Sequence, residues 1–321
     1  MSENLLLSLN ESQKIAAQHI DGPLLILAGA GSGKTKTITT RLAYLISIGI
    51  DPRSILTLTF TNKAATEMRE RAFNMIDSSM INTPPLLCTF HKFGLLFLKF
   101  HMSELNRKNN FIIIDTDDKK RIIKSLEKEI TTSLIVAEIS KYKNSLLTPN
   151  EAKKAAQLKL YQQIAEIYEQ YETYLEKNNL VDFDDLLLLP YKILSKNEKL
   201  AQEISQKYQY VMVDEYQDTN ELQYRLLRLL CSNHNNLCVV GDDDQSIYGW
   251  RGATIKNILN FSEHFENTIV VKLEENYRST DTILNHANQL IEHNRDRLGK
   301  KLVGTRQKGD SIRIYESQDE N

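Results

Sequence analysis

The sequence has few cysteines, and they are not arranged as a metal or disulfide framework. Cys88, Cys231 and Cys238 are the only three in 321 residues, and their spacing fits neither a zinc site nor a secreted disulfide scaffold. The N-terminal stretch MSENLLLSLNESQ has no basic segment followed by a long apolar one, and the aliphatic run at 186–189 is far too short to span a bilayer. We therefore expect a soluble cytoplasmic protein with no membrane partner.

An excess of charge of one sign is also missing. Forty basic residues stand against forty-two acidic ones, for a net charge of -2, so the total charge gives no sign of nucleic-acid binding. Residues 107–159 are locally basic, with twelve Lys or Arg against seven Asp or Glu. This excess fits a contact with a phosphate backbone and fits a solvated helical face equally well.

Short apolar runs recur along the chain, with helical spacing between them. The expected strands are 24–28, 55–60, 210–214, 237–242 and 268–273. Continuous apolar strands of this kind are buried on both faces, and their alternation with helices predicts an α/β fold with a mostly parallel sheet. A chain of this length with 41% hydrophobic residues predicts two domains.

The strand pattern fades between residues 101 and 180, where we expect a helical insertion. A helix is marked by six apolar positions and is expected to end at residues 178 and 179: Leu160, Ile164, Ile167, Tyr168, Tyr171 and Leu175. After residue 273 a helix is expected around 283–291, and the alternating SIRIY predicts a strand at 311–315. Fewer than fifty residues cannot bury a complete α/β core there.

The stretch AGAGSGKT at 28–35 follows an apolar run and opens a helical one, which is the context of a phosphate-binding loop. Small residues let the backbone N–H groups of residues 31–34 surround a phosphate oxygen. Lys34 supplies a positive charge for the β and γ phosphates, and the Thr35 hydroxyl can ligate magnesium. The loop consists of Ala28, Gly29, Ala30, Gly31, Ser32, Gly33, Lys34 and Thr35; Ala28 stands where the strictest pattern has glycine.

A second motif, VMVDEYQDTN at 211–220, places two acids at the end of another buried strand. Asp214 is expected to hold magnesium and Glu215 to polarise the attacking water. An acid pair alone fits a helix N-terminus as well, but that reading does not explain its position at a strand end. The two motifs together predict an ATP or GTP hydrolase.

Two further groups leave alternatives open. Asp242, Asp243 and Asp244 suit metal binding, and they suit helix capping with hydrogen bonds to the phosphate loop equally well, so none is assigned as a metal ligand. His91 titrates near neutrality, but no nucleophile motif accompanies it, which favours a nucleic-acid contact or a structural hydrogen bond.

The ordered motifs resemble those of UvrD, PcrA and Rep type superfamily 1 DNA helicases over about residues 9–280. The matching stretches are LNESQ, AGAGSGKT, TFTNKAA, TFH, DFDDLL, DEYQDTN, GDDDQSIYGWRGA and ENYRS. The resemblance implies a P-loop NTPase (RecA-like) parallel sheet in two parts, 1–100 and 181–273. The helical insertion would occupy 101–180, and 274–321 would be the incomplete start of a second RecA-like domain.

The resemblance also implies site residues for ATP and Mg²⁺. Gln13 would read the adenine edge, Tyr277 would stack on the base, and Arg278 would contact the γ phosphate. Lys34, Glu215 and Gln245 would be catalytic, with Gln245 at the γ phosphate or the attacking water. Thr35 and Asp214 would bind the metal.

The DNA-binding residues implied by the resemblance lie in three loops. They are Phe60, Thr61, Asn62, Thr89, His91, Tyr248, Trp250 and Arg251. Aromatic faces stack on any base, so a translocating motor can grip DNA without sequence preference. Core packing is the competing explanation for Phe60, which ends a strand, and for Trp250, the only tryptophan.

The function implied is an ATP-dependent 3′-5′ DNA helicase or single-stranded DNA translocase of repair or replication, working as a monomer on single strands and junctions. Family members continue for several hundred residues beyond ENYRS and carry a late arginine finger. We therefore expect an N-terminal fragment of a longer helicase, weak in ATP binding and hydrolysis, rather than a naturally short protein. The alternative is a nucleotide-dependent single-stranded DNA-binding module without motor activity.

Overall fold

A computed structural model describes residues 2–76, 83–249 and 252–316. Its centre is a six-stranded sheet with strand order β3-β2-β6-β7-β1-β8, in which every neighbouring pair is parallel. The strands are β1 (Leu24–Ala28), β2 (Ile55–Thr59), β3 (Leu86–Thr89), β6 (Tyr210–Val213), β7 (Leu237–Gly241) and β8 (Ile269–Leu273). The predicted α/β class and the five predicted strands are confirmed, and β3 was not predicted.

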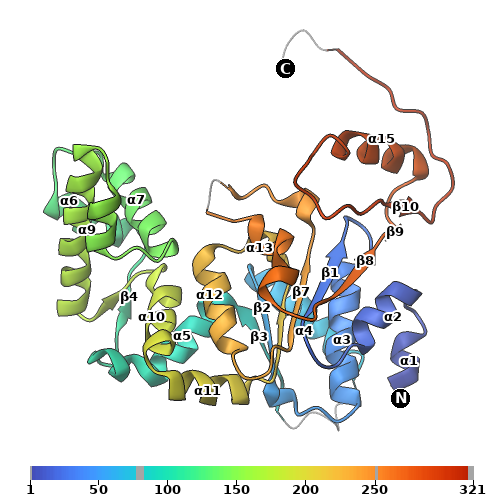
Figure 1. Cartoon of the computed structure of the whole chain (residues 1–321), viewed down its shortest axis with the longest axis horizontal. Helices are drawn as coiled ribbons and strands as arrows, with labels where there is room; N and C mark the ends of the chain where they lie inside the picture. The colour runs from blue at the N-terminus through green and yellow to red at the C-terminus, as the bar shows by residue number, and fades with distance from the viewer. Residues whose placement is uncertain (1, 77–82, 250–251, 317–321) are drawn as a thin grey trace.

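Helices cover both faces of this sheet (Figure 1). On one face, Leu25 and Leu27 of β1 and Leu56 and Leu58 of β2 pack against α5, α10, α11 and α12. On the other face, Leu24 and Ile26 pack against α2, α3 and α4. The bounds of these helices are α2 (Glu11–Gln18), α3 (Lys34–Ser47), α4 (Asn62–Phe73), α5 (Phe90–His101), α10 (Asp185–Lys196), α11 (Glu198–Lys207) and α12 (Glu221–Leu230).

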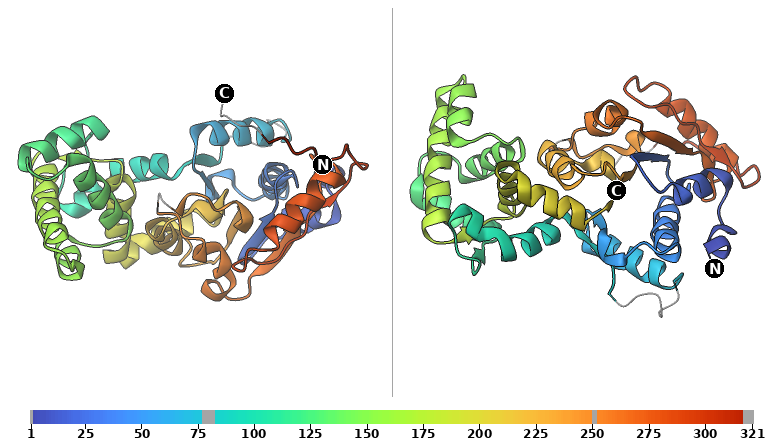
Figure 2. Two further views of the ribbon diagram at one scale, coloured as in Figure 1. Left: turned by 90° about the horizontal axis from the view of Figure 1, so that it is seen from above. Right: turned by 60° about the horizontal axis from the view of Figure 1, so that its bottom comes forward.

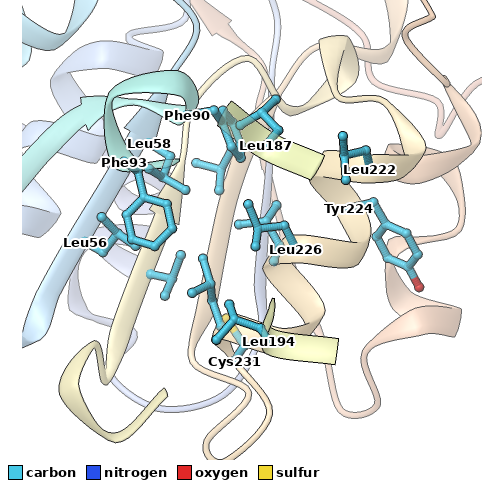
Figure 3. Close-up of a cluster of buried hydrophobic side chains, with 14 of the residues drawn as sticks. Leu56, Leu58, Phe90, Phe93, Leu187, Leu194, Leu222, Tyr224, Leu226 and Cys231 are labelled. Carbon is cyan, nitrogen blue, oxygen red and sulfur yellow. The ribbon is translucent and has the colours of Figure 1, made fainter. Parts of the chain in front are cut away.

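The larger of the two cores is built mainly from leucines and aromatic rings, and Figure 3 shows part of it. Leu56 and Leu58 of β2 face Phe90 and Phe93 of α5, and side chains of α10 and α12 close the cluster. Helices α5 and α10 approach so closely at Gly94 that a Cβ there would lie 1.7 Å from the Leu186 carbonyl oxygen. Only glycine permits this helix crossing.

A separate helical lobe lies at one end of the molecule, where the insertion was predicted (Figure 2). It comprises α6 (Thr116–Leu126), α7 (Thr132–Asn144), α8 (Pro149–Ala155) and α9 (Lys159–Lys177), and two short parallel strands, β4 (Ile112–Ile113) and β5 (Leu180–Val181), lie at its base. The lobe has its own core, which includes the α9 positions predicted from the sequence except Leu160, whose side chain is exposed. The expected helix end near residue 178 is confirmed.

A buried ion cluster joins the lobe to the sheet domain. The fully buried ammonium of Lys143 in α7 lies 2.7 Å from Asp185, 3.1 Å from Asp182 and 2.7 Å from Glu172. Burial lowers the pKa of Lys143, but attraction by these carboxylates outweighs it and holds the pKa well above its usual value. Asp182 and Asp185 belong to the DFDDLL stretch, so that motif fixes the start of α10 against the lobe.

The remaining elements connect those already described or lie near the chain ends. They are α1 (Ser2–Leu6), η1 (Pro52–Ser54), η3 (Met102–Leu105), η4 (Tyr216–Asp218), η5 (Asp243–Gln245), α13 (Lys256–Leu259), α14 (Phe261–His264), β9 (Glu275–Asn276), α15 (Asp281–Ile291) and β10 (Val303–Gly304). The predicted strand at 311–315 is wrong. These residues form no ladder, and Ile314 is 94% exposed, because alternating polarity makes a strand only beside a hydrogen-bonding neighbour. No helix in the described part is long and apolar enough to cross a membrane.

Candidate nucleotide and nucleic-acid site

The phosphate-loop sequence lies between β1 and α3, as predicted. Gly31 and Gly33 have φ of 76° and 86°, in the left-handed region that favours glycine. A Cβ at Gly33 would lie 2.7 Å from Gln13 Nε2, and one at Gly31 would lie 2.6 Å from Arg278 Cβ. The loop thus needs glycine for both backbone shape and space. It leads into the N-terminus of a 14-residue helix, where free N–H groups favour an anion.

Lys34 lies beside the second predicted motif. Its Nζ is 3.0 Å from Oε2 of Glu215, which directly follows Asp214 at the carboxyl end of β6. Glu215 has φ 51° and ψ 44°, a left-handed conformation that costs a residue with a Cβ roughly 1–2 kcal/mol. Such strain is typical of functional sites and here directs the carboxylate toward the phosphate loop.

Asp214 has the properties of a magnesium ligand. Its backbone N–H donates to the Leu58 carbonyl, and its Oδ1 is buried without a hydrogen-bond partner among the described residues. Burial, and then the charge of Glu215, raise the pKa of Asp214 to about 7, while Lys34 opposes the shift. A buried, unpartnered carboxylate oxygen suits a hard cation, and the hydroxyl of Thr35 in the first turn of α3 is a second oxygen donor.

A pocket of about 370 Å³ brings together predicted residues from both ends of the sequence. Its lining is Gly31, Gly33, Lys34, Thr35, Lys36, Glu67, Arg71, Tyr277 and Arg278. The sequence analysis gave no role to Lys36, Glu67 or Arg71, because all three lie outside the motif stretches. A larger pocket at 49–54 and 206–209 contains none of the predicted residues and lies at the amino edge of the sheet, where α/β proteins rarely bind ligands.

The residues predicted to contact the adenine lie close together. Gln13 completes a capping box with Asn10, and its Nε2 donates to the Ser32 carbonyl over 2.9 Å. Asn10 Nδ2 donates to the Tyr277 hydroxyl over 2.8 Å, and that hydroxyl donates to Glu275. The Gln13 amide therefore supports the phosphate loop in this structure, while the ring of Tyr277, 41% exposed, borders the pocket.

Asn276 is a residue that the sequence reasoning missed, although it lies within the quoted ENYRS. Its Nδ2 donates to the Ala30 carbonyl, and its Oδ1 accepts from the backbone N–H groups of Arg278 and Ser279 over 2.9 and 2.8 Å. The N–H of Tyr277 donates to the Gly31 carbonyl over 3.0 Å. One buried side chain thus fixes the backbone beside Arg278 against the phosphate loop.

The three adjacent aspartates do not form an open cation site. Their oxygens lie within 4.8 Å of one another, but the ammonium of Lys300 contacts all three, at 2.6, 2.5 and 2.6 Å. Burial lowers the pKa of Lys300, and the three carboxylates outweigh it and raise the pKa. Asp242 also caps η5 and accepts from Nε2 of Gln245, the predicted γ-phosphate contact. The predicted capping is present, but the side-chain hydrogen bonds of the triad to other described elements run to Gln245 and to segment 297–300 rather than to the phosphate loop.

The residues predicted to contact DNA follow β2 and β3 at the same edge of the sheet. Thr61 and Thr89 are the N-caps of α4 and α5, each accepting from a backbone N–H over 3.1 Å. Asn62, in the first turn of α4, is exposed. The centroid of the Phe60 ring lies 5.6 Å from that of Phe90, and the ring is partly exposed. One part of this side chain therefore packs against the core, and another part faces solvent.

His91 lies beside an aromatic residue that no role was predicted for. Its ring is 6.3 Å from that of Phe183, which is 53% exposed, and burial lowers the pKa of His91. Tyr248 is 38% exposed. The predictions for Trp250 and Arg251 fall outside the described residues.

Comparison with known families agrees with this arrangement. Residues 9–266 match the UvrD/REP helicase N-terminal domain, and residues 271–321 match the UvrD-like helicase C-terminal domain. The chain belongs to the UvrD/REP helicase family. The six-stranded parallel sheet with its phosphate loop is accordingly the RecA-like fold that was predicted.

Relatives in this UvrD/REP family match almost the whole chain. An ATP-dependent DNA helicase PcrA of Staphylococcus epidermidis is 41% identical over 98% of the chain, as is that of Staphylococcus aureus. A probable DNA helicase II homolog of Mycoplasma capricolum subsp. capricolum is 42% identical over the same share. The chain spans about 44% of the length of the PcrA proteins and 45% of the Mycoplasma protein.

Proposed function

We propose that the chain binds and hydrolyses ATP at the phosphate loop as part of an ATP-dependent DNA helicase. The observation that carries this proposal is the contact of Lys34 with Glu215 beside the buried Oδ1 of Asp214, which has no hydrogen-bond partner among the described residues. The names of the PcrA relatives support it. A phosphate cradle, a metal ligand and a water-orienting acid are together what phosphoryl transfer to water requires.

The proposal gives each of these residues a role. The N–H groups of residues 31–34 and the ammonium of Lys34 bind the β and γ phosphates, and Thr35 and Asp214 hold Mg²⁺. When bound, Mg²⁺ neutralises phosphate charge. Glu215 orients and deprotonates the attacking water, and Gln245 and Arg278 contact the γ phosphate. Gln13 and Tyr277 select adenine over other bases.

Single-stranded DNA lies across the carboxyl edge of the sheet in this proposal. Phe60, Thr61, Asn62, Thr89, His91, Tyr248, Trp250 and Arg251 contact it. Stacking on aromatic rings contributes roughly 1–3 kcal/mol per base without sequence preference. Because Gln245 and Tyr248 belong to one short loop, that loop responds to both the γ phosphate and the DNA.

The finer assignments are part of the same proposal. The motor moves 3′ to 5′ as a monomer in the cytoplasm, acts at single-strand to duplex junctions, and serves repair or replication. Residues 1–100 and 181–273 form the nucleotide domain, 101–180 the insertion, and 274–321 belong to the second RecA-like domain. Duplexes with a 3′ or a 5′ single-stranded tail test the polarity. Preferential ATP-dependent strand separation of the 5′-tailed duplex contradicts it.

Equilibrium titration with a fluorescent ATP analogue tests the nucleotide site itself. We expect Mg²⁺-dependent binding by the wild type and none by Lys34→Ala. Lys199→Ala is the matched control, because that lysine side chain is 87% exposed on α11 and away from the loop. Equal binding by all three chains, or binding unaffected by removal of Mg²⁺, contradicts the proposed site.

A further inference from the structure

The segment at 297–300 is bound to the acidic triad by an unusually dense set of charged contacts. Lys300, 5% exposed, contacts all three carboxylates, and Arg297 forms a bidentate pair with Asp244 at 2.9 and 2.8 Å. The backbone N–H of Leu298 donates to Asp243 over 2.7 Å. The triad belongs to the part of the chain that matches the N-terminal family domain, and 297–300 to the part that matches the C-terminal one.

The triad is in turn connected to the nucleotide site through Gln217. The backbone N–H of Asp242 donates to Gln217 Oε1 over 3.0 Å, and Gln217 Nε2 donates to Glu215 Oε2 over 2.9 Å. That oxygen also accepts from Lys34. Gln217 is 2% exposed and closely packed: a Cβ at Gly241 would lie 2.8 Å from its Oε1. Its amide therefore has little freedom to move independently of Asp242.

We propose that Lys300 is a positioning residue for ATP hydrolysis, which holds Asp242, and through it Gln217 and Gln245, so that the Glu215 carboxylate keeps its place beside Lys34. The proposal rests on the proposed ATPase function. Without the ammonium, the buried carboxylates of Asp242 and Asp243 lose their partner and repel each other, while Arg297 still pairs with Asp244, so we expect loss of the ammonium to displace η5. A movement of segment 297–300 is thereby transmitted to the water-activating acid.

The geometry favours this role over a purely structural ion pair. The three carboxylates that Lys300 contacts belong to one loop, and Asp242 of that loop is hydrogen-bonded both to Gln245 and, through Gln217, to Glu215. The triad also lies at the carboxyl end of β7, adjacent to β6, which is followed directly by Asp214 and Glu215. The contacts thus join the catalytic edge of the sheet to a segment that begins beyond its last strand.

Hydrogen exchange tests the connection without relying on activity. Lys300→Met keeps the length of the side chain and removes the charge, and Lys301→Met is the matched control because Lys301 is exposed. We expect amide exchange to rise roughly tenfold in Lys300→Met at both 241–246 and 214–218, the scale of losing a charged hydrogen-bond partner. A change confined to 241–246, or an equal change in Lys301→Met, overturns the proposal.

Kinetics then separate positioning from general damage. Lys300→Met should lower the turnover number roughly 10- to 100-fold with ATP affinity within about threefold, and Lys300→Arg should recover most of the loss. Turnover and affinity that fall together overturn the positioning role. If the wild type binds no ATP, the proposed function fails, and the exchange at 214–218 still decides whether Lys300 controls the position of Glu215.

Discussion

Lys34 and Glu215 lie 181 positions apart in the sequence, and their side chains meet in an ion pair with 3.0 Å between Nζ and Oε2. The pair joins the phosphate loop after β1 to the acidic turn after β6. Its lysine side chain is 14% exposed and its glutamate 39%, so both groups remain accessible to a ligand entering from the edge of the sheet. Substitutions that remove one charge at a time therefore separate the role proposed for Lys34 in phosphate binding from the role proposed for Glu215 in water activation.

Replacing Glu215 by glutamine should uncouple binding from hydrolysis. Gln keeps the size of the side chain but cannot accept the water proton, so we expect ATP affinity to change by no more than a few fold. Hydrolysis should fall by roughly 10²–10⁴, the usual effect of a positioned base. Single-turnover hydrolysis at saturating ATP measures this, and unchanged turnover removes Glu215 from its proposed role.

Asn276 is expected to set nucleotide affinity. Asn276→Asp keeps the acceptor for the Arg278 and Ser279 N–H groups and replaces the donor to Ala30 by a carboxylate that repels that carbonyl. We expect the dissociation constant of a fluorescent ATP analogue to rise roughly tenfold or more. Asn294→Asp, on an exposed residue of the same segment, is the control, and equal affinities of the two variants contradict the prediction.

Gly33→Ala should lower thermal stability and nucleotide affinity by more than its backbone strain alone explains. A residue with a Cβ at positive φ costs about 1–2 kcal/mol, and the new methyl would also displace Gln13. Gly49→Ala is the matched control, because Gly49 has φ 97° and open space around its Cβ position. Thermal unfolding and nucleotide binding should both be worse in Gly33→Ala. Identical behaviour of the two variants argues against the Gln13 contact.

Lys143→Met should destabilise the junction of the lobe and the sheet domain. It leaves Asp185 and Glu172 without their cation and Asp182 with Lys119 alone, and removing one partner of a buried ion pair typically costs about 3–5 kcal/mol. Urea denaturation gives the free energy of unfolding. The control is Lys141→Met on the same helix, whose lysine side chain is 69% exposed. A loss no greater than that of the control shows that the cluster does not stabilise the fold.

His91 should make the fold less stable in mild acid. Burial lowers the pKa of His91 below 6.5, so the unfolded chain binds its proton first as pH falls. The free energy of unfolding then decreases from about pH 6.5 down to the lower folded-state pKa. His91→Gln removes this contribution, so the difference in stability between about pH 7.5 and about pH 5 should be smaller than in the wild type. An equal difference contradicts it.

The sheet could be predicted because its strands are buried and apolar. All five residues of β1, β2 and β7 are buried, which is why continuous apolar runs identified them. The short β3 was missed because LLCT follows two prolines and offers only four residues. The prediction of a strand at 311–315 was wrong. Alternating polar and apolar residues favour a strand, but they do not show whether a neighbouring strand is present to pair with it.

The candidate site was predictable where function requires a residue type at a fixed spacing, as for Lys34 and the acids at 214 and 215. Contacts between distant residues leave no such local signal. Lys300 and Asn276 are ordinary residues in their own stretches, and their contacts with Asp242 and Ala30 follow only from what the fold places opposite them. Gly94 is a further example, since its partner Leu186 is on another helix.

The most direct test of the central claim is steady-state ATP hydrolysis with and without single-stranded DNA, in the wild type and in Lys34→Ala. The account predicts that DNA raises hydrolysis in the wild type and that Lys34→Ala stays at background in both conditions. If the wild type binds ATP and DNA yet its hydrolysis equals that of Lys34→Ala, the site does not act as a DNA-coupled ATPase. The chain is then a nucleotide-dependent single-stranded DNA-binding module.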